Sequence, residues 1–181
     1  MADPSTAPPL TRASVQAAHE LIKPYIHETP VLTNSTLNRL ASTPRTPAEL
    51  EGTEWAGRTP SKPVIRFWFK CENFQKIGAF KARGAFHAIE RLKQEPGWVE
   101  GGGRERGVVT HSSGEPPCLP FSSLFHLVFK FSILTTPGNH AQALSLAASL
   151  SSIPAHIIMP TISTPSKIAA TRSYTPNICT L

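Results

Sequence analysis

The order of apolar segments after Arg106 constrains the fold more than any other feature of this sequence. Residues 108–110 are typical of a buried strand, residues 139–150 of a helix rich in alanine and leucine, and residues 155–159 of a second strand. Pro165 then stands where a further helix would begin. Strands that alternate with helices form parallel sheets with right-handed crossovers. The chain is therefore predicted to be an α/β protein.

The residues before Arg106 predict a mixture of helices and strands. The expected elements are a helix over 13–23, capped by Thr11 or Ser14 and stopped by Pro24, an extended piece over 30–32, a helix over 35–40 capped by Ser35, a strand over 64–70 and a helix over 79–93. The last helix is expected to pack through Phe80, Gly84, Ala88 and Leu92, with Gly84 allowing close approach of a neighbour. Residues 41–63 are predicted to be a long surface loop.

Charge and cysteine usage exclude several classes of protein. The net charge is +6 over 181 residues, and acidic residues lie among many of the basic ones. A nucleic-acid interface would instead show a clustered basic stripe with interleaved aromatics. The three cysteines lack metal-ligand spacing and fit a reducing compartment. Residues 1–10 carry no secretory or typical mitochondrial signal and are predicted to be a disordered lead, so we expect a cytoplasmic protein without a membrane partner.

A strand, a glycine turn and a helix that opens on Lys81 follow one another in the middle of the chain. This layout presents the Lys81 amine at the edge of a cleft, where it can form a Schiff base, and Ala79 and Phe80 give it an apolar setting. The stretch from Phe69 to Ala85, FKCENFQKIGAFKARGA, closely resembles the lysine motif of the fold-type II pyridoxal-phosphate enzymes. It lacks the Asn-Pro and Asp of cysteine synthases, and so is most similar to the serine/threonine dehydratase and serine racemase branch.

The resemblance implies a fold, a cofactor and a reaction. The fold would be three-layer parallel-sheet units of the tryptophan synthase β-like architecture, incomplete in this chain. Lys81 would hold pyridoxal 5'-phosphate as a Schiff base beside Phe80, and the cofactor would act as the electron sink for an amino acid's α-carbon. The reaction would remove water and then ammonia from L-serine or L-threonine, and serine racemase activity could accompany it. The full-length form would be a homodimer.

A second motif of the same branch, Ser-Ser-Gly-Asn-His-Ala-Gln, is split in this chain. Its two parts are residues 112–114 and 138–142, and Glu115–Pro137 lies between them. The resemblance implies that Ser113 exchanges a proton on the face opposite Lys81. It also implies that Asn139 hydrogen-bonds the cofactor's ring oxygen.

Three interpretations of the inserted segment compete. A transmembrane helix is disfavoured because the apolar stretch is short and is interrupted by His126 and Lys130. A genuine lid is disfavoured because long apolar loops are unusual in compact α/β units. We favour a retained in-frame intron, because the glycine is duplicated and the distance from Gly114 to Gly138 is 24 residues, or 72 nucleotides. The codons of Gly114-Glu115 and Pro137-Gly138 can supply the GT and AG splice sites.

Other candidate residues have simpler interpretations. Cys71 is more typical of a buried thiol at a strand end than of a nucleophile. His111 and His140 flank the split motif and are expected to be structural. Residues 101–103 precede a strand, so they are predicted to be a plain turn and not the phosphate loop. No metal constellation is present. The phosphate loop and a divalent-metal site are expected only in a missing C-terminal part.

The domain organisation follows from these observations. Residues 11–106, with the surface loop over 41–63, are predicted to be the N-terminal part of the large cofactor domain. Residues 107–181 are predicted to be an incomplete small α/β domain, interrupted by 115–137. Two functions remain open: the dehydratase described above, and a non-catalytic truncated product of such a gene that cannot hold the cofactor.

Overall fold

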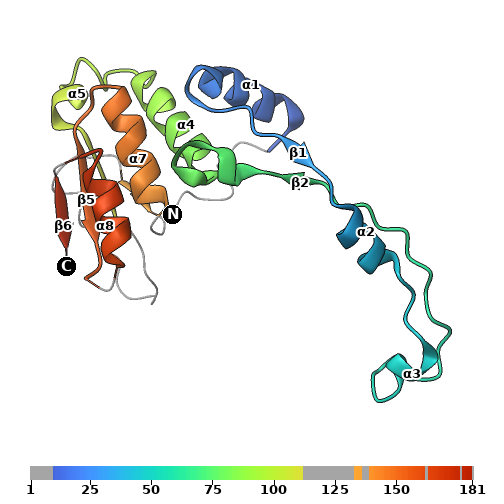
Figure 1. Cartoon of the computed structure of the whole chain (residues 1–181). Coiled ribbons are helices and arrows are strands. Elements are labelled where there is room, and N and C mark those ends of the chain that lie inside the picture. Colours follow the sequence, from blue (N-terminus) through green and yellow to red (C-terminus); the bar gives the residue numbers. More distant parts are fainter. Residues whose placement is uncertain (1–9, 112–132, 136–138, 162, 176, 181) are drawn as a thin grey trace. The chain divides into compact units, whose positions relative to one another are not determined.

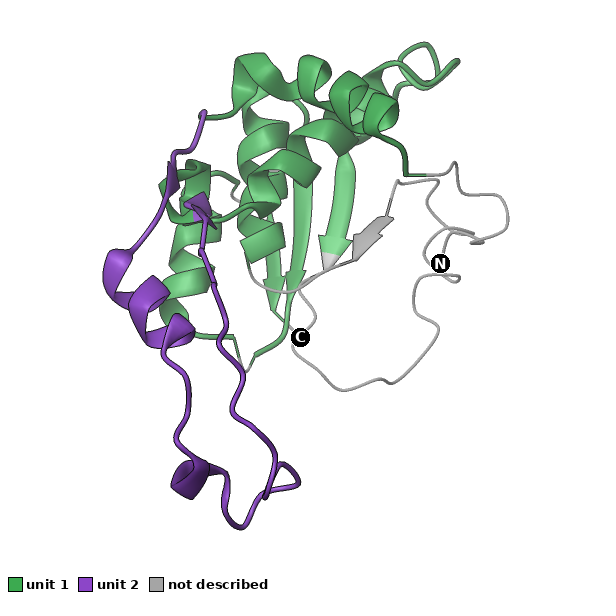
Figure 2. Cartoon of the chain, turned by 90° about the vertical axis from the view of Figure 1, so that its right-hand side faces the viewer, with its two compact units in different colours: residues 1–27, 73–181 green, residues 28–72 purple. Residues whose placement is uncertain are grey.

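The structure is a computed structural model that describes residues 10–111, 133–135, 139–161, 163–175 and 177–180. The chain divides into two compact units, coloured separately in Figure 2. One contains residues 1–27 and 73–181, and the other contains residues 28–72. Ser113, most of the predicted insertion and residues 1–9 of the predicted lead lie outside the described residues.

The larger unit is built on a four-stranded parallel sheet. Its strands are β3 (Val108–His111), β4 (Ile133–Thr135), β5 (Ala155–Met159) and β6 (Ile178–Thr180), in the order β4-β3-β5-β6. All three pairings are parallel, and Val108 lies opposite Ala155. This arrangement confirms the predicted α/β class. The edge strand β4 was not expected, because it falls within the segment predicted to be an insertion.

Helices cover the sheet and enclose the core. They are α1 (Arg12–Ile22), α4 (Lys81–Lys93), α5 (Gly103–Arg106), α7 (Asn139–Leu150) and α8 (Pro165–Arg172), with one-turn 3₁₀ helices η1 (Lys23–Tyr25), η2 (Glu72–Phe74) and η3 (Lys76–Gly78). Helices α4 and α7 pack side by side, and α1 packs against α4 (Figure 1). Phe86 is fully buried and stacks on Tyr25 with ring centroids 5.4 Å apart. Within the described residues, no helix is long and apolar enough to span a bilayer.

Local signals placed several elements correctly. The bounds of α7 and β5 are those expected, and α8 begins at Pro165 as predicted. The α1 cap is Thr11, whose hydroxyl accepts from the Ser14 backbone in a reciprocal capping box.

The predicted packing face of α4 is right for Leu92, which is buried in the core, and wrong for Phe80 and Gly84. Its fully buried side chains are Ala82, Ala85, Phe86 and Ile89, which recur at helical spacing and pack against α7. Phe80 and Gly84 are exposed, and a Cβ added at Gly84 would meet nothing within 4 Å. Gly84 therefore does not provide a close approach.

The smaller unit is a largely extended segment over residues 28–72. Strands β1 (Val31–Leu32) and β2 (Phe69–Lys70) pair antiparallel, and helices α2 (Ser35–Ser42) and α3 (Pro47–Leu50) lie between them in the chain. The strand predicted over 64–70 is thus only two residues long, because residues 64–68 have no ladder partner. Helix α2 is capped by Asn34, not Ser35, since the Asn34 carboxamide oxygen accepts from the Leu37 backbone at 2.9 Å.

Domain boundaries remain a prediction. The expected division between residues 106 and 107 would separate α4 from α7, which pack together in the larger unit.

Candidate active site

Lys81 is the first residue of α4, and a strained turn delivers the chain to it. Ile77 has φ 59° and Gly78 has φ 67°, so two consecutive residues are left-handed just before the helix. That conformation is costly for a branched residue such as Ile77 and persists only when its surroundings hold it. The surrounding structure must therefore hold this turn, which sets where α4 and its first residue, Lys81, begin.

Gln75 holds this turn in place. Its side chain is 3% exposed, and its oxygen accepts from the His27 backbone at 2.9 Å and from the Lys76 backbone at 3.0 Å. Its amide nitrogen donates to the His27 carbonyl at 2.8 Å. His27 precedes residues 28–72 and Gln75 follows them. These bonds therefore hold the two flanks of that segment together and fix the residues that lead to Lys81.

The Lys81 amine is half-buried and has no carboxylate partner within the described residues. Its Nζ lies 5.2 Å from the centroid of the Phe80 ring, which is 59% exposed. By contrast, Lys70 donates to the Thr29 carbonyl at 2.6 Å, and Lys76 lies over the Phe86 ring. Among the described residues, the contact of the Lys81 amine is with the aromatic face of Phe80.

Helix α7 packs against α4, and its first turn holds two further candidate residues. His140 is 7% exposed, and its Nε2 has no hydrogen-bond partner within the described part of the chain. Burial, and then the positive charge of Lys81, lower the pKa of His140. The two side chains are therefore within electrostatic reach. Asn139, exposed at the start of α7, precedes His140.

Sheet geometry explains this meeting of residues. In Figure 1 the first turns of α4 and α7 lie at the same end of the helix pair. Ligands of open α/β sheets bind at the carboxyl ends of the strands, where helices begin. Lys81 is the first residue of α4, and Asn139 and His140 are the first two residues of α7. The effect of the Lys81 charge on His140 was not predicted, because helix packing leaves no local signal.

The residues present fit a cofactor with an aldehyde and polar ring substituents. Lys81 provides an amine and Asn139 provides an exposed amide. The Nε2 of His140 is a buried polar atom without a hydrogen-bond partner among the described residues. Residues 101–103 were predicted to be a plain turn, but the one-turn helix α5 begins at Gly103. A Cβ at Gly103 would overlap the Trp98 ring, so packing accounts for this glycine.

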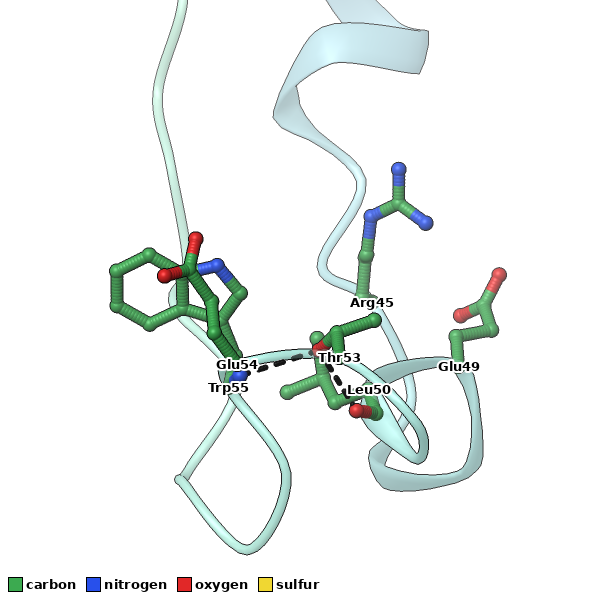
Figure 3. Close-up of a pocket in the computed structure, with 6 residues that line it drawn as sticks. All are labelled: Arg45, Glu49, Leu50, Thr53, Glu54 and Trp55. Carbon is green, nitrogen blue, oxygen red and sulfur yellow. Dashed lines mark hydrogen bonds between the residues drawn. The ribbon is translucent and has the colours of Figure 1, made fainter.

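A separate hollow of about 580 Å³ lies in the smaller unit (Figure 3). Its polar groups already serve the local fold. The Glu49 carboxylate accepts from the Thr46 backbone at 2.7 Å, and bonds from Thr46 lower the pKa of Glu49. The Thr53 hydroxyl donates to the Leu50 carbonyl at 2.7 Å. We therefore assign no chemistry to this hollow.

Two further sequence predictions concern thiols and metals. Cys71 is half-buried, and its thiol donates to the Phe69 carbonyl at 3.4 Å. Among the described residues, no group of three His, Cys, Asp or Glu side chains could hold a metal ion.

Comparison with known proteins decides the family. Residues 49–115 match the family of pyridoxal-phosphate dependent enzymes. Serine racemase of Schizosaccharomyces pombe is 35% identical over 164 residues, which cover 91% of this chain and 34% of that protein. The structure of maize serine racemase superposes with a TM-score of 0.59 at 31% identity, covering 93% of this chain and 35% of the maize chain.

The chain belongs to the fold-type II pyridoxal-phosphate enzymes. Within them it falls in the serine racemase and dehydratase branch. It is also 33% identical over 169 residues to L-threo-3-hydroxyaspartate ammonia-lyase of Saccharomyces cerevisiae, covering 93% of this chain and 35% of that enzyme. The chain thus spans about a third of the length of the relatives it matches. The family is one of cofactor-dependent racemases and lyases that act on amino acids.

Proposed function

We propose that the complete protein is a pyridoxal-phosphate-dependent L-serine/L-threonine ammonia-lyase that can also racemise serine. The observation that carries this proposal is the amine of Lys81 at the start of α4, in a sequence shared with this branch. Relatives named serine racemase and L-threo-3-hydroxyaspartate ammonia-lyase support both halves of the activity. The bound cofactor supplies an electron sink for the substrate's α-carbon.

Each site residue has a defined task in this proposal. The Lys81 Nζ would hold the cofactor covalently and would carry the α-proton on one face of the substrate. Ser113, outside the described residues, exchanges a proton on the opposite face. The exposed Asn139 amide would hydrogen-bond the cofactor's ring oxygen, and the Phe80 ring lies beside the Lys81 amine. We further propose a cytoplasmic homodimer for the complete form.

A second candidate function rests on the split motif. Ser113 and Asn139 are separated by 25 residues, so this polypeptide would be a non-catalytic product of a gene whose spliced form is the enzyme. Removing residues 115–138 would delete β4, which is an edge strand, and leave the order β3-β5-β6 intact. It would also join β3 to α7 by a short loop, as strand–helix units require.

Visible absorbance after addition of pyridoxal phosphate separates the two candidates. The enzyme proposal predicts a cofactor band that is lost in Lys81→Arg and kept in Lys167→Arg, an exposed lysine on α8. The same band in all three proteins would refute the role of Lys81. A band that forms only after deletion of residues 115–138 would favour the non-catalytic product, and transcript sequence across codons 114 to 138 would show whether the spliced form exists.

A further inference from the structure

One leg of the smaller unit is bonded along one of its two backbone edges only. Residues 64–70, VIRFWFK, are exposed along their whole length (Figure 2). Three odd-numbered residues donate their backbone N–H groups to the same side: Ile65 to the Ser42 hydroxyl at 3.0 Å, Phe67 to the Asn38 carboxamide oxygen at 2.8 Å, and Cys71 to the Pro30 carbonyl at 3.0 Å. The odd-numbered residues therefore turn their backbone groups toward β1 and α2.

The even-numbered residues turn theirs the opposite way. Successive backbone groups of an extended chain alternate in direction, so the N–H and C=O groups of Val64, Arg66 and Trp68 face away from β1 and α2. Among the described residues, these backbone groups have no hydrogen-bond partner. Val64 is 83% exposed and Trp68 is 69% exposed. An edge with free backbone groups and exposed apolar side chains is a template for pairing with another strand.

The same strand of a second copy fits this edge. Two identical strands that pair antiparallel obey a two-fold axis, the commonest symmetry of oligomers. Even-numbered residues must then face even-numbered ones, because both strands must present their free groups. The registers that keep most of residues 64–70 paired are therefore centred on residues 66, 67 and 68.

Charge selects one of these registers. Pairing about Arg66 sets that cation against itself, and pairing about Trp68 sets Arg66 against Lys70. Like charges directly opposite each other are destabilising. Pairing about Phe67 avoids both conflicts, because it sets Arg66 against Trp68. Lys70 then lies opposite Val64, so each cation meets an apolar side chain.

We propose that residues 64–70 are a dimerisation edge, at which two copies of this chain pair antiparallel about Phe67. The two β1–β2 ladders then join into one antiparallel sheet across the two-fold axis. The Arg66 guanidinium of each copy lies against the Trp68 ring of the other, a favourable cation–π arrangement. On the other face the Phe67 rings of the two copies meet beside Phe69, whose ring lies 5.8 Å from that of Phe67 in the same chain. The inference uses only the smaller unit and is independent of the proposed function.

Sedimentation velocity of the full chain over a range of concentrations measures this pairing. Trp68→Arg sets a new positive charge against Arg66 of the other copy. The double variant Arg66→Glu/Trp68→Arg restores opposite charges at the same two positions. Trp55→Arg is the matched control, because Trp55 is also exposed in the smaller unit but lies outside residues 64–70. Circular dichroism and thermal melting check that each variant keeps the fold.

The pairing about Phe67 predicts a specific pattern. We expect the unsubstituted chain to show a monomer–dimer equilibrium without larger species, since a two-fold pairing closes. Trp68→Arg should raise the dissociation constant at least about tenfold, because two cation–π contacts are replaced by like charges. The double variant should return to within about threefold of the unsubstituted chain, and Trp55→Arg should leave the equilibrium unchanged.

Three results overturn the inference. A monomer at every concentration would show that a second copy does not occupy the edge. Association that grows without limit would show that apolar exposure alone drives it, without a two-fold pairing. A double variant as weakly associated as Trp68→Arg would exclude the register about Phe67.

Discussion

Gln75 is predicted to be the residue that contributes most to holding the turn before Lys81. Its buried side chain makes three hydrogen bonds, two to the His27 backbone and one to the Lys76 backbone. At about 1 kcal/mol for each bond, Gln75→Leu loses about 3 kcal/mol. The added apolar burial of leucine returns about 1 kcal/mol. The expected net loss in unfolding free energy is therefore about 2 kcal/mol.

Urea unfolding followed by circular dichroism measures this loss directly. Gln94→Leu is the matched control, because Gln94 is exposed at the end of α4 and should change stability by less than about 0.5 kcal/mol. Since the turn at Ile77 and Gly78 would relax, the Gln75 variant should also react less at Lys81. A Gln75→Leu chain as stable as the Gln94→Leu chain would refute the reasoning.

Two further predictions use glycines and pH. Gly84→Ala should raise the free energy of unfolding by about 0.5–1 kcal/mol, because space is open at this helical position. Gly107→Ala should lower it by about 1–3 kcal/mol, because φ is 81° and the new Cβ would overlap Pro154. Urea unfolding of both variants tests these values, and equal effects would contradict them. The folded-state pKa of His140 lies below its usual 6.5, so the unfolded chain binds more protons at this residue and stability should fall as pH drops below about 6.5. Melting between pH 7.5 and 5 should show a smaller loss in His140→Gln, and parallel curves would exclude His140 as the cause.

Sequence reasoning succeeded where the signal is local. The alanine- and leucine-rich run of α7, the apolar run of β5 and Pro165 at the start of α8 each fix their element through nearby residues. The alternation of these elements also predicted the parallel sheet.

It failed where the answer depends on distant residues. Phe80 was expected on the packing face because of its spacing from Gly84 and Leu92, but α4 buries its small residues Ala82 and Ala85 and leaves Phe80 exposed beside Lys81. The motif placed Lys81 at a helix start. It could not show that the charge of Lys81 lowers the pKa of His140, since this effect depends on the packing of α4 against α7.

The most direct test of the account is to find which lysine carries the cofactor. The chain is incubated with pyridoxal phosphate, reduced, digested and mapped by mass spectrometry. We predict that Lys81 carries most of the adduct although it is half-buried, and that Lys81→Arg removes it. Adduct spread over the exposed lysines, Lys23 and Lys167 among them, with Lys81 unmodified, would contradict the account.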